Sequence, residues 1–116
     1  MPLRLVQVAM DARDDAAVGR FWAQALGWSG SSEGPGVTNV EPVGFAYPDP
    51  VAVCIDVLAV PEPKTVKNRV HLDLATDDRA AEIARLVSRG ATVLAEYDHW
   101  TTLADPDGNE FCVSDR

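Results

Sequence analysis

The fold is decided by one stretch of the chain, Val70–Gly90, with the sequence VHLDLATDDRAAEIARLVSRG. Its first five residues alternate apolar and polar side chains, which predicts a strand over Val70–Leu74. Asp77 and Asp78 follow as an acidic entry to a helix, where a carboxylate is favourable beside the positive end of the helix dipole. Apolar residues then recur at helical spacing up to Gly90, a typical helix end. The stretch predicts a strand followed directly by a helix.

The same pattern occurs once before in the chain. Residues 3–10 are apolar and partly β-branched, which predicts a strand, and a second acidic pair, Asp14–Asp15, opens a helix that ends at Gly27. Gly27 lies 63 residues before Gly90, and the two acidic pairs have the same separation. This constant spacing favours a duplicated unit.

Short strands are expected in the rest of both halves. Residues 29–50 are rich in Gly, Ser and Pro and are interpreted as turns between short strands, and the sequence DPDGN at Asp105–Asn109 predicts a tight turn. The strands are predicted at 43–47, 51–60, 91–96, 100–103 and 111–114. Pro61 and Pro63 lack the amide hydrogen that a central strand needs, so they mark a connector.

These elements predict an α+β fold made of two strand–helix–strand–strand–strand (βαβββ) modules. The first module is expected at about 3–60, the connector at 61–68 and the second module at about 69–115, within a single domain of residues 1–116. A length of 116 residues fits one compact domain with its own core.

The charge balance of the chain argues against several classes of partner. Ten Lys and Arg residues stand against 18 Asp and Glu residues, which gives a net charge of −8. A nucleic acid or an anionic membrane would be repelled, and no apolar run reaches the length of about 20 residues that spans a bilayer. The first residues lack the pattern of a signal peptide, and two cysteines are too few for a disulfide scaffold. A cytoplasmic protein is therefore expected.

Three stretches resemble one known family. They are 21–28 (FWAQALGW), 60–74 (VPEPKTVKNRVHLDL) and 104–113 (ADPDGNEFCV). Together they are similar to the vicinal oxygen chelate superfamily, which includes glyoxalase I, extradiol dioxygenases and bleomycin-resistance proteins, and most of all to its small bacterial glyoxalase-like domains. The resemblance implies two curved mixed sheets around a cavity that binds a small molecule, and association as a homodimer.

The resemblance also implies where a divalent ion would bind. Metal-using relatives take one ligand from the first strand of each half and usually an acidic ligand from the last strand of each half. Gln7 and His71 match the first-strand positions. In the last strand the acidic position aligns best with Cys112, while Glu110 lies two residues earlier on the same face.

The acidic position of the first half falls at Asp56 or at Leu58. A site of Gln7, His71 and Glu110, with Asp56 if the register allows it, suits Zn, Ni, Mn or Fe. Glu110 would act as ligand or as catalytic base.

Strand alternation places further candidates on the same polar faces. The expected substrate pocket combines the following residues: Gln7, Asp56, His71, Asp73, Trp100 and Cys112. A purely structural interpretation remains open, in which His71 pairs with Asp73 and the cysteines are small core residues.

The resemblance, together with this set of residues, implies two alternative functions. One is a metal-dependent lyase, isomerase or dioxygenase of the glyoxalase type, in which the ion activates a substrate with adjacent oxygens. The other is a metal-free binding or sequestering protein for a small molecule such as an antibiotic, with affinity from desolvation and aromatic stacking.

Overall fold

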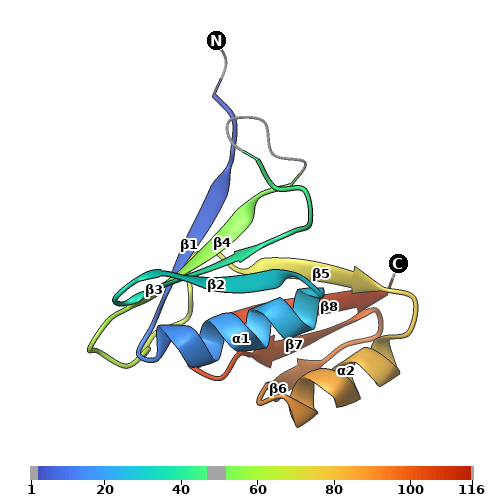
Figure 1. Ribbon diagram of the computed structural model, residues 1–116. Coiled ribbons are helices and arrows are strands. Elements are labelled where there is room, and N and C mark those ends of the chain that lie inside the picture. The colour runs from blue at the N-terminus through green and yellow to red at the C-terminus, as the bar shows by residue number, and fades with distance from the viewer. Residues whose placement is uncertain (1–2, 47–51, 116) are drawn as a thin grey trace. The chain divides into compact units, whose positions relative to one another are not determined.

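A computed structural model describes residues 3–46 and 52–115 of the chain. The chain divides into two compact units, Met1–Pro63 and Lys64–Arg116. Each unit contains one helix and four strands in the order strand–helix–strand–strand–strand (Figure 1). The expected α+β fold with two βαβββ modules is therefore confirmed.

The first unit is a mixed four-stranded sheet with one helix. Its elements are β1 (Gln7–Ala12), α1 (Asp15–Leu26), β2 (Ser29–Gly34), β3 (Val37–Glu41) and β4 (Cys54–Ala59). The strand order is β1-β4-β3-β2, with β1 and β4 parallel and the other neighbours antiparallel. The first and last strands of the unit are therefore neighbours, although they are far apart in the sequence.

The second unit repeats this topology. Its elements are β5 (Leu72–Thr76), α2 (Arg79–Ser88), β6 (Thr92–Glu96), β7 (Trp100–Ala104) and β8 (Glu110–Asp115). The strand order is β5-β8-β7-β6, and β5 pairs with β8 in parallel (Figure 1). Both described helices are too short and too polar for a membrane span.

Both helices begin where the sequence predicts. The Asp14 and Asp78 side chains accept hydrogen bonds from the backbone N–H groups of Ala17 and Ala81, at 3.0 Å and 3.1 Å. These contacts satisfy donors that the first turn of a helix leaves unpaired. Helix α1 ends at Gly27, whose φ of 68° is the left-handed conformation that glycine adopts without strain.

The two units bury their helices to different extents. Helix α1 buries Val18, Phe21 and Trp22, and the Phe21 and Trp22 rings meet edge to face with centroids 5.3 Å apart. Helix α2 buries Leu86 as its one fully enclosed residue among those described. The first unit therefore has the larger helix–sheet core.

The structure corrects the prediction for residues 29–46. Most of this segment was predicted to form turns, but it forms β2 and β3, an antiparallel hairpin with a register shift between Ser32 and Gly34. The strand β2, with the sequence SGSSEG, has weak strand propensity and is stabilised by pairing with β3, which in turn pairs with β4. The chain reverses at Val43–Phe45, where the Phe45 N–H donates to the Pro42 carbonyl. The predicted strand at 43–47 is therefore wrong over 43–46, and Tyr47 lies outside the described residues.

Candidate functional site

The candidate site of the second unit lies on three adjacent strands. Asp73 on β5 pairs in register with Cys112 on β8, and Cys112 pairs with Thr102 on β7. Residues in register across a sheet point to the same face, so these three side chains form one row. The Thr102 hydroxyl and the Cys112 sulfur lie 3.4 Å apart and share a hydrogen bond.

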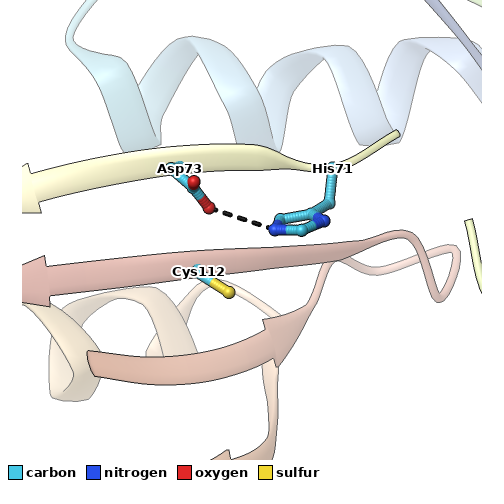
Figure 2. A group of neighbouring side chains, drawn as sticks. All are labelled: His71, Asp73 and Cys112. Atoms are coloured by element: carbon cyan, nitrogen blue, oxygen red, sulfur yellow. Dashed lines mark ion pairs between the residues drawn. The ribbon is translucent and has the colours of Figure 1, made fainter. Parts of the chain in front are cut away.

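His71 completes this cluster from the residue before β5. Its Nε2 lies 3.2 Å from Oδ1 of Asp73, and these two groups and the Cys112 sulfur all lie within 4.8 Å of one another. Figure 2 shows the imidazole and the carboxylate of the ion pair, with the Cys112 sulfur nearby on the adjacent strand. The His71 side chain is 39% exposed and that of Asp73 is 70% exposed, so a solute can reach both. We call these three residues the His71 cluster.

The His71 cluster lies in a hollow of about 410 Å³, here called the second-unit hollow. The other residues lining it include His99, Trp100 and Ser114. The Trp100 ring stacks on Tyr97 with centroids 4.5 Å apart and an angle of 19° between the planes. This volume is in the range of small-molecule sites, and Trp100 supplies an aromatic wall.

Arg79 holds the loop that carries this aromatic wall. Its guanidinium donates to the backbone carbonyls of Tyr97 and Asp98, at 3.0 Å and 2.8 Å. The same group forms an ion pair with Asp115 at 3.2 Å. Arg79 therefore links the start of α2 to the β6–β7 loop and to the end of β8. These contacts hold the loop that leads into Trp100, the first residue of β7.

Glu110 makes different contacts. One carboxylate oxygen accepts from the Lys64 ammonium at 2.9 Å, and the other accepts from the Asn68 N–H at 3.0 Å. Burial alone would raise the pKa of Glu110, but the hydrogen bonds from Lys64 and Asn68, with the Lys64 charge, lower it overall. A carboxylate with a lowered pKa and these two donors on it is a weak base. Its contacts support a role in fastening residues 64–68 to β8, and the predicted catalytic role stays a prediction.

The first unit places an amide and a carboxylate where the second unit has a hydroxyl and a thiol. Asp56 on β4 pairs in register with Ala9 on one side and with Asn39 on the other, as Cys112 does with Asp73 and Thr102. The Asn39 amide donates to Oδ1 of Asp56 at 2.8 Å. If Gln7 is taken as the counterpart of His71, the registers make Asp56, and not Leu58, the counterpart of Cys112.

A second hollow, of about 430 Å³, lies in the first unit and is called the first-unit hollow. Gln7 and Asp56 line it together with Glu33, Asn39, Glu41 and Phe45. Gln7 also accepts a weak hydrogen bond from the Cys54 thiol, at 3.5 Å between Sγ and Oε1. Gln7 and Asp56, the two candidate residues of the first half, therefore line the same hollow.

The His71 cluster has the donor chemistry that a divalent ion requires. An imidazole nitrogen, a carboxylate oxygen and a thiolate at bond lengths of 2.0 to 2.3 Å would stand about 3.3 to 3.8 Å apart in a tetrahedral site. The three donor atoms lie within 4.8 Å of one another, so small side-chain movements would bring them to the separations of a tetrahedral site. Among residues 3–46 and 52–115, this is the one group of three such side chains that meets the distance requirement. The residues fit zinc well because the set mixes nitrogen, oxygen and sulfur.

Known proteins agree with this architecture. Residues 7–114 match the model of the glyoxalase-like domain family, and the chain belongs to that family. No curated protein matches the sequence significantly.

Several solved structures share this fold. A glyoxalase/bleomycin resistance protein/dioxygenase family enzyme from Burkholderia phytofirmans has a TM-score of 0.72 at 21% identity, covering 97% of this chain and 98% of its own. An antibiotic binding protein from a Streptomyces species has a TM-score of 0.67 at 22% identity, covering 98% and 96%. The glyoxalase I of Leishmania major has a TM-score of 0.69 at 14% identity, covering 98% and 87%.

The structure brings together most of the residues that the sequence singled out in the second half. His71 and Asp73 lie in contact, as the structural interpretation allowed, and Trp100 and Cys112 line the same hollow. Sequence reasoning missed Asn39 and Thr102, which partner Asp56 and Cys112. Nothing in the sequence could identify these two, because the strand register selects them.

Proposed function

We propose that the protein is a metal-dependent enzyme of the glyoxalase type, with its ion held in the second unit by His71, Asp73 and Cys112. The observation that carries the proposal is the approach of the three donor atoms to within 4.8 Å of one another, beside a hollow large enough for a small molecule. Three protein ligands leave a coordination position open for substrate, as in catalytic zinc sites. A homodimer and a cytoplasmic location remain predictions.

The residues of the second-unit hollow have separable tasks. The hydrogen bond between the Thr102 hydroxyl and the Cys112 sulfur holds that sulfur in place beside the hollow. Trp100 offers an aromatic face to the carbon skeleton of a substrate, and the stacked Tyr97 holds that face. When bound, the ion would act as a Lewis acid that polarises a substrate oxygen.

The proposed ligand set differs from the one that the sequence suggested. Gln7, His71 and Glu110 were expected to hold the ion, and this set is still untested. The contacts of Glu110 with Lys64 and Asn68 favour Asp73 and Cys112 in its place, because the Lys64 ammonium already neutralises the Glu110 carboxylate and would repel a metal cation there.

Metal titration tests the proposal directly. Zinc and cobalt(II) are added to chelator-treated protein, and binding is followed by calorimetry and by the sulfur-to-cobalt absorption band. We expect one site with an affinity tighter than about 100 μM, weakened at least tenfold by Cys112→Ser. Glu110→Gln serves as the matched control and should leave the affinity unchanged. Affinity weaker than about 100 μM for both metals would contradict the proposal.

A metal-free binding protein is the second candidate. The stacked pair of Tyr97 and Trp100 favours it, because both aromatic side chains are partly exposed at 49% and 40%. Such a surface binds planar molecules by stacking and desolvation. Quenching of tryptophan fluorescence by a panel of planar aromatic compounds should survive EDTA and disappear in Trp100→Ala if this candidate is correct.

A further inference from the structure

We infer that the second-unit hollow selects an elongated planar substrate that carries a hydroxyl group at the end away from its metal-binding oxygens. His99 is the residue that accepts a hydrogen bond from this hydroxyl. The inference rests on the proposed function, because it takes the His71 cluster as the metal-binding end of the hollow. It adds a substrate class and a specificity-determining residue to that function.

Two successive rows of side chains cross the sheet beside the hollow. Asp73, Cys112 and Thr102 form the first row, and Trp100 on β7 pairs in register with Ser114 on β8 in the second row. Ser114 follows Cys112 by two residues, so both side chains point to the same face. Because a strand rises about 3.3 Å per residue, the second row lies about 7 Å from the first. A molecule bound at the His71 cluster that extends along the strands therefore meets the Trp100 ring next.

His99 lies beyond the second row. It precedes Trp100 in the chain and lines the hollow with an imidazole that is 84% exposed. The Asp115 N–H donates to the His99 carbonyl at 2.9 Å, so the end of β8 holds this residue in place. The order along the hollow is therefore the His71 cluster, the Trp100 ring and the His99 imidazole.

Asp115 also orients the His99 imidazole. Nδ1 of His99 lies 3.7 Å from Oδ2 of Asp115, and Oδ1 of Asp115 is 3.2 Å from Nε of Arg79. A carboxylate beside Nδ1 favours the proton on that nitrogen, which leaves Nε2 of the neutral imidazole as a hydrogen-bond acceptor. This end of the hollow therefore suits a hydroxyl group, which can donate to Nε2.

An anionic group is less suited to the same end. The carboxylates of Asp73 and Asp115 line the hollow, and the chain has a net charge of −8, so a further negative charge is disfavoured. An aromatic ring between the two ends of the substrate would stack on Trp100. The substrate class is therefore an aromatic compound with adjacent oxygen donors on one side of the ring and a hydroxyl group opposite them.

Two hydroxamates test this inference with zinc-loaded protein. Para-hydroxybenzohydroxamate and para-methylbenzohydroxamate both chelate a metal ion through adjacent oxygens and have similar shapes, but only the first carries a donor opposite the chelating group. We expect calorimetry to show at least about threefold tighter binding of the hydroxyl compound. Equal binding of the two compounds, or binding of neither, would overturn the inference.

Removal of the metal separates this inference from the proposed function. EDTA should weaken both hydroxamates by the same factor, because the chelating group is common to them. Binding that EDTA does not change, with the preference for the hydroxyl compound retained, would contradict the proposed metal site and support the contact with His99.

Matched variants assign the preference to His99. Because its imidazole is exposed, His99→Leu should keep the fold and the zinc affinity, and should bring the two hydroxamates to equal affinity. Trp100→Ala removes the aromatic wall, so it should weaken both compounds and keep their ratio. A preference that survives in His99→Leu, or that Ser114→Ala abolishes, would refute the assignment.

Discussion

The two units share one backbone plan but differ in chemistry. In each unit, the first and last strands pair in parallel. The side chain of a central residue on the last strand forms a hydrogen bond with a side chain on the antiparallel neighbouring strand. In the first unit that pair is Asp56 with Asn39, and in the second it is Cys112 with Thr102. The first hollow therefore offers oxygen atoms and negative charge, while the second offers a thiol and an imidazole. A duplicated fold can thus place different side chains at matching positions without a change of topology.

Stability should differ between the units because α1 is buried more deeply than α2. Trp22→Ala removes the largest enclosed side chain and is expected to lower the free energy of unfolding by about 3 to 5 kcal/mol, with Leu86→Ala nearer 2 kcal/mol. Urea titration of both variants measures the two values. Val66→Ala, at a side chain that is 76% exposed, should change stability by less than about 0.5 kcal/mol. A greater loss of unfolding free energy for Leu86→Ala than for Trp22→Ala would contradict the conclusion that the first unit has the larger core.

The ion pair between Lys64 and Glu110 is a second difference, because the registers place Cys54 at the corresponding position of the first unit. Lys64→Met would leave a largely enclosed carboxylate without its counter-charge, and we expect a loss of about 2 kcal/mol at neutral pH. The pKa of Glu110 in the folded state lies below its ordinary value of 4.5. Its stabilising contribution is therefore present above that value and is lost as the pH falls through the folded-state pKa.

Glu110→Gln should accordingly differ most from the natural protein at neutral pH. The difference in unfolding free energy should shrink on acidification below pH 4.5. Urea titrations at several pH values measure this change. A difference that grew on acidification would show that Glu110 is not held in its charged form.

Helix capping should be alike in the two units. Asp14→Ala and Asp78→Ala each remove one side-chain acceptor from a backbone N–H, and each is expected to cost about 1 kcal/mol. Chemical denaturation of the two variants should give matching losses, whereas a twofold difference would mean that the units do not use their acidic helix entries equally.

The smallest expected effect concerns the ion pair of His71 and Asp73. Both side chains are well exposed, so Asp73→Asn should change stability by less than about 0.5 kcal/mol in metal-free protein. With zinc present the same variant should lose more, because a ligand is removed. Thermal unfolding with and without zinc provides the comparison, and equal effects under both conditions would argue against Asp73 as a ligand.

Local patterns predicted much of this fold from the sequence. The helix entries at Asp14 and Asp78 and the end at Gly27 follow from short-range hydrogen bonding and backbone conformation. The prediction was wrong for residues 29–46 because β2 contains Ser and Gly, which have low strand propensity. This edge strand is stabilised by its pairing with β3 and not by its own sequence.

The candidate site was predictable only in part, for a similar reason. His71 and Asp73 are two residues apart on one chain segment, so alternation alone places them together. Glu110 meets Lys64 across 46 residues, and Asn39 meets Asp56 across 17, so neither contact could be inferred before the strand register was known.

The central claim is that the thiol of Cys112, in the second unit, binds the metal ion. Zinc X-ray absorption spectroscopy of protein loaded with one equivalent of zinc tests this most directly, because sulfur and lighter ligands scatter differently. The account predicts one sulfur at about 2.3 Å, with nitrogen and oxygen neighbours at about 2.0 to 2.2 Å. A coordination shell of nitrogen and oxygen alone would contradict it.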